Sequence, residues 1–586
     1  MRLRFMLCLG ATLVAAGLLS ACSGSRGGLT TSIPGVPNGL HTRIAQGTGT
    51  SGIESAPAPA KSSSVAFNDY VTFGYDNARD AFNPNSSTIT PAALPKLHLA
   101  WQSAIGGGDF NVQSQPILAT EIAKHAGLLF VGGGSGRVFG YDALTGATVW
   151  TTDLGTLSYS YCGESTFYFG VGGSAAYDPA TKSLYIVGNK NPSLNAFGKN
   201  ILYHLEAATG RVLGHVDFTS APAGPTEQNF GHTSVTLQNG VAYVGTGSTC
   251  DVSSWRGRVV AVNVPAMTIG RTFFTVWDPH NLRGQGAQPW GGGGIWGWGG
   301  VSLDPSGNVL TGVGNTDNGT SSNGSIKPPF EAAPHEYSGY GETLLELSSN
   351  LSTVIGDNHP IPTNQYNGVS IDLDVQGTPL VVTPNGAGCD TMIAQQGKSG
   401  ELTVYDESRL SAGFAAQYQL SPSTYSDGYL GDPAYSSATG LIYAPVASSV
   451  SPTLFPPGLI AIDPGCGTPS VTWHAAFGSD SSGTGIPRSV PAASAGGVVF
   501  AGSVNGTGGD FWAIDAATGN VLNGGTPILA TSGYLRTPAT IDGDWIFVLD
   551  GDGNLYGLTT NPAYPGIAPK IRPHPARSVV WPTTRG

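Results

Sequence analysis

The chain has 586 residues, of which 86 are glycine, and only 11% are charged. A composition so rich in glycine and so poor in charge excludes a mostly helical protein and favours many short strands joined by tight turns. The net charge of −12, with no cluster of Lys and Arg after the first residues, excludes a nucleic-acid-binding surface. The hydrophobic fraction of 40% is large enough to form a buried core.

The N-terminus has the pattern of an export signal. Arg2 and Arg4 precede an apolar run over residues 5–19, and the sequence Leu-Ser-Ala-Cys ends at Cys22. This pattern predicts a signal peptide over residues 1–21 and not a membrane span, because the apolar run is short and ends at small residues. Cys22 resembles the acylated cysteine of a bacterial lipobox; the alternative is an ordinary signal peptide followed by a cysteine. We therefore expect an exported protein, anchored to the bacterial cell envelope by an N-terminal lipid on the periplasmic or surface side.

Residues 22–66 are rich in Gly, Ser, Thr, Ala and Pro, which predicts a flexible tether before a domain of residues 67–586. That domain contains Cys162, Cys250, Cys389 and Cys466. In an oxidising compartment four cysteines permit two disulfides with three connectivities. The sequence has no Cys-x-x-Cys-His, so no c-type haem is expected on this chain.

A repeat unit recurs over residues 128–558. In its clearest copy two strand patterns meet at a Gly turn and end at Asp142, and a Thr-Gly turn at 145–146 leads to Trp150. Alternating apolar residues predict half-buried strands, while Asp and Thr-Gly close a turn with local hydrogen bonds. Eight units are present, and they end at Asp142, Glu206, Asn263, Leu347, Asp406, Asp463, Asp515 and Leu558.

These eight units predict an all-β fold, an eight-bladed β-propeller. Eight four-stranded sheets arranged in a ring would leave no long open edge, because the ring closes on itself. A β-sandwich is the alternative with similar strand content. A β-helix is excluded, because a unit of about 50 to 60 residues is too long for one of its coils.

The unit with Asp142, Thr-Gly at 145–146 and Trp150 resembles the repeat of the pyrroloquinoline-quinone (PQQ) type of β-propeller. Residues 73–79 (Phe-Gly-Tyr-Asp-Asn-Ala-Arg) and 97–101 are similar to the first segment of the quinoprotein alcohol dehydrogenases. The branch that it resembles most is the one similar to polyvinyl-alcohol dehydrogenase. Noncatalytic scaffolds share these repeats, so the repeats alone do not decide the function.

Two stretches resemble cofactor-binding segments of that family. Residues 290–298 resemble the segment that supplies a tryptophan floor beneath the quinone, a role that the resemblance gives to Trp296. A flat quinone needs a flat aromatic platform, and the alternative is a structural Gly/Trp layer. Residues 309–315 resemble the segment that ends in an Asn whose side-chain oxygen binds the active-site cation, so Asn315 is the implied metal ligand. The alternative is an Asn in a blade turn.

A third stretch, residues 371–380 with 396–400, resembles the Asp-x-Asp and Gln-Lys-x-Gly pair of the same branch, with Gly397 inserted before the lysine. The resemblance implies that Asp372 is the general base for the alcohol proton. Asp374, two residues further along a strand, would point the same way and serve as another metal ligand. Lys398 would place its ammonium against the quinone oxygens and stabilise charge that develops on reduction.

The pattern departs from the family at its acidic metal ligand. The nearest carboxylate in the third repeat is Asp251, one residue out of register, and alignment to the earlier repeat would place Asn195 at this position instead. Gln113 stands where relatives have an acidic residue that contacts the cofactor. Such losses are expected of a diverged or inactive copy.

The resemblance as a whole implies a PQQ-dependent dehydrogenase with Ca²⁺ or a lanthanide. Its substrate would be an alcohol or a sugar-like hydroxyl, and its electrons would pass to a separate acceptor such as a cytochrome. The alternative is a noncatalytic propeller lipoprotein that binds envelope proteins. The joint presence of Trp296, the Asp-x-Asp sequence and Lys398 favours cofactor binding, because a scaffold has no reason to keep all three.

Overall fold

The computed structural model describes most of the chain between residues 66 and 570. The described ranges are 66–105, 114–159, 167–194, 196, 198–219, 229–231, 233–248, 256–275, 291–314, 316–317, 340–360, 374–375, 377–398, 400–420, 431–446, 455–478, 490–505 and 508–570. They belong to one compact unit, Thr50–Thr583. Their helices are the short 3-10 helices η1 (Leu94–Lys96), η4 (Glu407–Ala412) and η5 (Asn523–Gly525). None of the helices in these ranges is long and apolar enough to cross a membrane.

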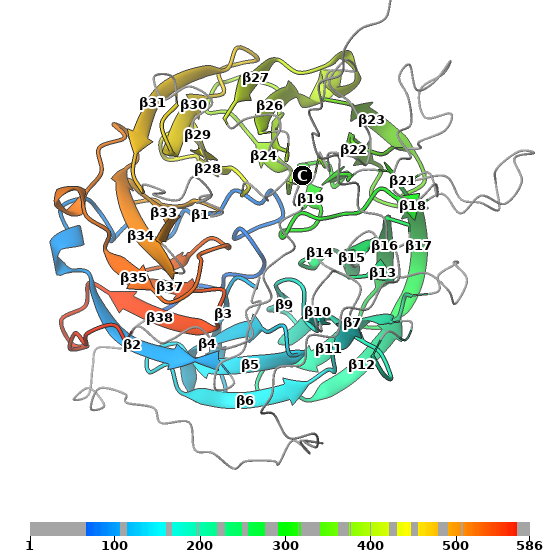
Figure 1. Cartoon of the computed structure of the whole chain (residues 1–586), viewed down its shortest axis with the longest axis horizontal. Coiled ribbons are helices and arrows are strands. Elements are labelled where there is room, and N and C mark those ends of the chain that lie inside the picture. The colour runs from blue at the N-terminus through cyan, green and yellow to red at the C-terminus, as the bar shows by residue number, and fades with distance from the viewer. Residues whose placement is uncertain are drawn as a thin grey trace, which may run out of the picture. The chain divides into compact units, whose positions relative to one another are not determined.

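Eight four-stranded antiparallel sheets surround a common centre (Figure 1), which confirms the predicted eight-bladed β-propeller. From the innermost strand outward, the first four blades are β3 (Ile117–Ile122), β4 (His125–Gly132), β5 (Arg137–Asp142) and β6 (Thr148–Asp153); β9 (Ala176–Asp178), β10 (Ser183–Lys190), β11 (Lys199–Glu206) and β12 (Val212–Asp217); β14 (Thr236–Gln238), β15 (Val241–Ser248), β16 (Arg258–Asn263) and β17 (Thr268–Phe274); and β19 (Ser302–Leu303), β20 (Val309–Gly312), β22 (Leu344–Leu347) and β23 (Val354–Asn358).

The other four blades repeat the pattern. They are β24 (Leu380–Val382), β25 (Met392–Gln396), β26 (Glu401–Asp406) and β27 (Ala416–Gln419); β28 (Ala434–Ser436), β29 (Leu441–Val446), β30 (Gly458–Asp463) and β31 (Ser470–Ala476); β32 (Ala492–Ser494), β33 (Val498–Asn505), β34 (Gly508–Asp515) and β35 (Leu529–Thr531); and β36 (Thr540–Asp542), β37 (Trp545–Leu549), β38 (Asn554–Thr559) and β2 (His98–Ala104). The eight repeat units found in the sequence each end on the third strand of one blade.

Short strands add to this ring. β1 (Phe82–Asn83) pairs in parallel with β32, and β13 (Asn229–Phe230) pairs with β15. β7 (Leu157–Tyr159) pairs with β8 (Phe167–Phe169), and β18 (Gly291–Gly292) pairs with β21 (Thr316–Asp317). The ring closes where β2, from the start of the domain, pairs with β38 near its end. This pairing joins the two ends of the domain, because β2 supplies the fourth strand of the last blade and covers the edge of β38.

The core lies between neighbouring blades, where each sheet buries both of its faces. In the seam between the fourth and fifth blades, for example, Leu310 and Leu344 pack against Val381, Ile393 and Tyr405. Strands buried on both faces read as nearly continuous apolar runs, which is why the repeats were visible in the sequence. One disulfide, Cys389–Cys466, ties the turn after β24 to the turn after β30. Cys162 and Cys250 lie outside the described residues.

An N-terminal segment, residues 68–83, winds around the centre and contacts the inner edge of every blade in order. We call it the axial segment; it is the blue trace at the centre of Figure 1. It makes these hydrogen bonds: Tyr70 N to Leu118 O (2.8 Å), Tyr177 N to Val71 O (2.7 Å), Thr72 Oγ1 to Val235 O (3.0 Å), Leu303 N to Asn77 O (2.8 Å), Val381 N to Ala78 O (3.0 Å), Tyr435 N to Asp80 O (2.9 Å), Ala493 N to Ala81 O (3.0 Å) and Asn83 Nδ2 to Ile541 O (3.0 Å).

Asp542 fastens the two ends of the axial segment. Its carboxylate accepts hydrogen bonds from Asn68 N (2.8 Å), Asn68 Nδ2 (3.0 Å) and Asn83 Nδ2 (2.9 Å). Midway along the segment, Arg79 is 2% exposed and its guanidinium donates to Phe73 O and Thr72 Oγ1, both at 2.7 Å. A buried guanidinium with acceptors on several sides fixes the fold of the segment that surrounds it.

Candidate functional site

Three of the predicted site residues lie in the described part of the chain, at one end of the ring of blades. Trp296 is in the loop between β18 and β19, Asp374 precedes β24, and Lys398 is in the turn between β25 and β26. This is the end of the ring at which the second strand of a blade finishes. The axial segment contacts the inner strands nearer the other end, where the second strand begins.

The Trp296 indole is half-buried among glycines. A Cβ atom on Gly247 would lie 2.9 Å from the indole, one on Gly294 would lie 2.6 Å from it, and one on Gly314 would lie 2.5 Å from Nε1. Any side chain at these positions would therefore displace the ring. The Phe230 ring packs at a tilt with its centroid 6.0 Å from that of Trp296. The glycines seen in the sequence thus make room for an aromatic plate at the channel end.

Lys398 and Asp374 form a buried ion pair. Lys398 Nζ lies 2.7 Å from Asp374 Oδ2, and the two side chains are 15% and 3% exposed. The backbone joins the same two residues, because Lys398 N donates to Asp374 O at 3.0 Å. A charge-assisted hydrogen bond of this length in a poorly solvated place is strong, and removing one partner would leave a buried charge.

The ion pair and the indole meet at Gly314. A Cβ atom on this glycine would be 2.4 Å from Asp374 Oδ1 and 2.5 Å from Trp296 Nε1. Trp296, Asp374 and Lys398, which are far apart in the sequence, therefore lie around one point, and we call this group the axial site. It offers an aromatic plate, a carboxylate and an ammonium side by side.

The remaining predicted residues lie outside the described residues. They are Asp372, Asn315, Asp251, Gln113 and the lipidation candidate Cys22. Their roles, and the boundaries predicted for the signal peptide, tether and domain, stay predictions. The axial site itself fits the group that the resemblance implies: a flat ring can lie against Trp296, an anionic oxygen can accept from Lys398, and a hard cation can bind the Asp374 carboxylate.

Two charged residues near the axial site were not singled out by the sequence. Arg256 is 3% exposed, forms a β-bridge with Gly292, and holds its guanidinium carbon 4.5 Å from the centroid of the Phe274 ring. Glu401, the first residue of β26, is 4% exposed, and burial raises its pKa to about 7. The feature of the sequence that could have identified Glu401 is an acidic residue at the first position of the third strand of a blade, directly after the turn that contains Lys398.

A second acidic group lies at the opposite end of the seam between the fourth and fifth blades. Carboxylate oxygens of Asp304, Glu346 and Glu407 lie within 4.8 Å of one another, beside a cavity of about 680 Å³. Burial and then the Asp304 charge raise the pKa of Glu346 to about 7, and the same causes, with Glu346 added, raise that of Glu407 to about 8. This group is separate from the axial site.

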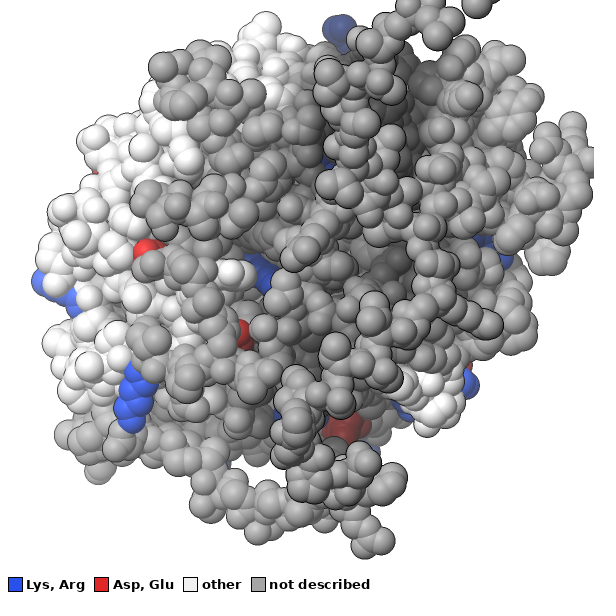
Figure 2. Space-filling view, viewed as in Figure 1, with Lys and Arg blue, Asp and Glu red and all other residues white. Residues whose placement is uncertain are grey.

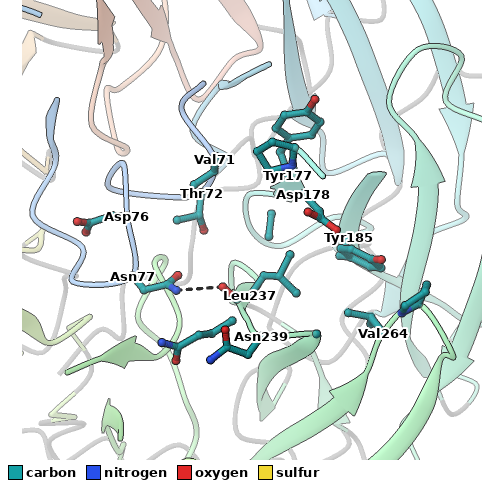
Figure 3. Close-up of a pocket in the computed structure, with 15 residues that line it drawn as sticks. Val71, Thr72, Asp76, Asn77, Tyr177, Asp178, Tyr185, Leu237, Asn239 and Val264 are labelled. Carbon is teal, nitrogen blue, oxygen red and sulfur yellow. Dashed lines mark hydrogen bonds between the residues drawn. The ribbon is translucent and has the colours of Figure 1, made fainter. Parts of the chain in front are cut away.

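Another cavity, of about 400 Å³, opens beside the axial segment and is also separate from the axial site. Figure 3 shows Asn77 of that segment pointing at the Leu237 carbonyl, to which its Nδ2 donates at 3.0 Å, with Tyr177 and Asp178 across the cavity. On the face seen in Figure 2, charged side chains of the described residues occur singly, without a continuous basic patch. The expectation that nucleic acid does not bind stays a prediction.

Comparisons with known proteins agree with this architecture. Residues 98–265 match the model of a protein family described as "Outer membrane protein assembly factor BamB". No curated protein matches the sequence.

Several solved structures share the fold at low identity. The quinohemoprotein alcohol dehydrogenase from Comamonas testosteroni is 16% identical with a TM-score of 0.60, over 86% of this chain and 82% of that one. The quinohemoprotein alcohol dehydrogenase ADHIIG from Pseudomonas putida HK5 is 15% identical with a TM-score of 0.62, over the same shares of the two chains. A europium-containing methanol dehydrogenase is 15% identical with a TM-score of 0.59, over 84% of this chain and 98% of that one. The shared fold identifies the chain as an eight-bladed β-propeller. The family match covers residues 98–265, less than half of the chain, and is consistent with propeller repeats of the PQQ type.

Proposed function

We propose that the chain is a PQQ-dependent dehydrogenase that oxidises an alcohol or a sugar-like hydroxyl and passes the electrons to a separate acceptor such as a cytochrome. The observation that carries this proposal is the axial site, where Trp296 and Asp374 meet at Gly314 and Lys398 pairs with Asp374. A propeller that serves only as a scaffold needs no half-buried indole beside a buried ion pair at its channel end. The fold neighbours that are alcohol and methanol dehydrogenases support the same proposal.

The chain's own residues would bind and orient the reactants. The Trp296 indole would hold a flat quinone by stacking, and Lys398 Nζ would donate to a quinone oxygen while it keeps its bond to Asp374. Asp374, with Asn315 and Asp251, would ligate Ca²⁺ or a lanthanide, and Asp372 would accept the hydroxyl proton. A bound quinone supplies the acceptor for the electron pair of the substrate C–H bond.

The proposal includes the location that the N-terminus suggests. Acylation of Cys22 would anchor the protein to the bacterial envelope, and the tether of residues 22–66 would link the lipid to the propeller. Mass spectrometry of the membrane-extracted protein would test this. The mature chain should begin at Cys22 and carry the mass of attached acyl chains; a chain that begins elsewhere would contradict it.

Quinone binding tests the enzymatic proposal directly. Purified protein is titrated with PQQ in the presence of Ca²⁺ or La³⁺ while tryptophan fluorescence and quinone absorption are followed. Dye-linked oxidation of alcohols and sugars is then measured on the loaded protein. We expect saturable binding, and activity that Asp372→Asn abolishes while binding persists.

A pair of tryptophan variants provides the matched control. Trp296→Phe should weaken PQQ binding about tenfold, because a smaller ring loses about 1.4 kcal/mol of stacking. Trp298→Phe should leave binding unchanged, since Trp298 packs with Phe73 and Val490 in a separate cluster. Absence of PQQ binding, or an equal loss in both variants, would reject the proposal.

A second candidate is a noncatalytic scaffold that binds envelope proteins. It is favoured by one observation, the match of residues 98–265 to a family named for an outer-membrane assembly factor. Isolation of the protein from its own membranes, without added quinone, distinguishes the two. A stoichiometric envelope partner together with no PQQ binding would support the scaffold.

A further inference from the structure

The seam between the fourth and fifth blades contains a buried carboxylate that the roles proposed so far do not use. Glu401 begins β26, immediately after the turn of residues 397–400 that carries Lys398. Its backbone closes that turn, because Gly397 N donates to Glu401 O at 3.1 Å. The side chain reaches back along the turn, so that a Cβ atom on Gly397 would lie 2.7 Å from Glu401 Oε1. Glu401 is therefore held against the backbone next to Lys398.

The Glu401 carboxyl group has too few donors for a buried anion. The residue is 4% exposed, and Oε2 is buried without a hydrogen-bond partner in the described part of the chain. Ionising a carboxyl group in such surroundings is costly, because burial removes its solvation and the one backbone hydrogen bond to it compensates its charge only in part. Burial accordingly raises the pKa of Glu401 to about 7.

A neighbouring acceptor also lacks a donor. Gln395 on β25 is 1% exposed; its Nε2 donates to Gly377 O at 2.9 Å, and its Oε1 is buried without a partner. Gln395 is paired with Thr403, two residues along β26 from Glu401, and Ile393 and Tyr405 on the same faces pack toward the fourth blade. Gln395 and Glu401 are thus diagonal neighbours on one face of the sheet. A proton on Glu401 would relieve the shortage of donors at this face.

We propose that Glu401 is a proton-holding residue that gives up or takes back its proton as the charge of the axial site changes. The inference deepens the proposed function and rests on it in one respect, because the anionic quinone is the ligand that would change this charge. When negative charge arrives beside Lys398, Glu401 takes up a proton from solvent. When that charge leaves, the proton returns to solvent.

Charged or titratable groups lie on the elements that pack around Glu401. Glu342, which is fully buried, precedes β22 on the face of the fourth blade that packs in this seam. Asp374 and Lys398 lie at the turn, and Tyr405 is on the same face of β26. Toward the sixth blade, Asp432 Oδ1 accepts from Thr378 N at 2.7 Å. Burial raises the pKa of Glu401, and on the proposal a negative charge removed from the nearby turn should lower it.

The first experiment needs no cofactor. Infrared difference spectra of the protonated-carboxyl band are recorded across pH 5–9 for the wild type, Glu401→Gln and Glu407→Gln. Glu407 is the matched control, a glutamate of the same blade whose pKa is also raised but which lies at the other end of the seam. We expect one component with a midpoint near pH 7 that Glu401→Gln removes and Glu407→Gln retains. An unchanged titration in Glu401→Gln would overturn the inference.

The second experiment changes the charge of the axial site inside the protein. Asp374→Asn keeps the shape of the side chain and an oxygen that accepts from Lys398, but removes one negative charge. The midpoint of the Glu401 component should then fall by about one pH unit. A midpoint that does not move would overturn the coupling, even if Glu401 does hold a proton.

The third experiment joins the inference to the proposed function. PQQ is titrated into the protein at pH 7.5 in buffers of different ionisation enthalpy, so that calorimetry counts the protons taken up on binding. Wild type and Glu407→Gln should take up a fraction of a proton that Glu401→Gln does not. Binding with the same uptake in Glu401→Gln would overturn the inference. A complete lack of PQQ binding would reject the proposed function, while the first two experiments still decide the role of Glu401.

Discussion

Replacing Gly146, a turn residue of the first blade, should lower the stability of the propeller more than replacing most other turn residues. It follows Thr145 in the turn after β5, with φ of 67°, and it supports the Trp101 side chain of the preceding blade. Trp101 Nε1 donates to Ala143 O at 3.1 Å, which locks β2 of the last blade onto this turn of the first. A Cβ atom on Gly146 would lie 2.4 Å from Trp101 Cε3 and 2.7 Å from Ser103 Oγ.

The cost of Gly146→Ala has two parts. A left-handed backbone costs an alanine about 1–2 kcal/mol relative to glycine. Overpacking against a buried indole costs about 1–3 kcal/mol more. The free energy of unfolding should therefore fall by about 2–5 kcal/mol, and the blade that closes the ring should loosen first.

Gly543→Ala separates the two parts. Gly543 also has a positive φ, 55°, but a Cβ atom there would meet nothing within 4 Å. This control should lose only the backbone part, about 1–2 kcal/mol. Guanidinium denaturation followed by tryptophan fluorescence gives both values. If the two variants lose stability equally, the Trp-on-glycine contact does not hold the blades together as argued.

Three other perturbations have defined outcomes. Stability should fall as pH rises from about 5 to about 8, because Glu346 and Glu407 have pKa values raised to about 7 and about 8, so the folded state keeps protons that the unfolded state has already released. Urea midpoints measured across this range should vary less in Glu407→Gln than in the wild type, and an unchanged slope would contradict the assignment. Asp542→Ala should cost about 1–3 kcal/mol, because it removes the acceptor of three hydrogen bonds from Asn68 and the buried Asn83 at the two ends of the axial segment. Hydrogen exchange should be faster in that segment than elsewhere, and uniform exchange would contradict the role of Asp542 in holding it. The Cys389–Cys466 disulfide closes a loop of 77 residues, so its reduction should lower the free energy of unfolding by about 2–4 kcal/mol. Cys389→Ser should lower the free energy of unfolding by the same amount, and reductant should then cause no further change.

The features that sequence predicted well are those made by neighbouring residues. The turn that begins at Asp142 is an example: its Oδ1 accepts from Leu144 N, Thr145 N and Thr145 Oγ1. All of these atoms lie within three residues, so the same letters specify the same turn wherever they recur. The same bonds form at Asp515 in the seventh blade. Repetition of such local units is what made the propeller predictable.

The axial site was predictable only in part. Trp296, Asp374 and Lys398 were identified one by one through resemblance, and the structure brings them together. The contact of Trp296 and Asp374 at Gly314 depends on how the fourth and fifth blades are placed beside each other. Asp372, which carries the proposed chemistry, lies outside the described residues. Glu401 was missed because what distinguishes it is its burial, with an Oε2 atom that has no donor among the described residues. That property belongs to the packed seam and not to any short stretch of sequence.

The axial segment has a consequence for traffic through the ring. Residues 68–83 hydrogen-bond to every blade and bury Arg79 among them, so this segment occupies the centre of the ring at its end. A ligand of the axial site would then approach from the other end, where Trp296, Asp374 and Lys398 lie. The proposed cofactor, substrate and electron acceptor would share that approach, so product departure and electron transfer would compete for it.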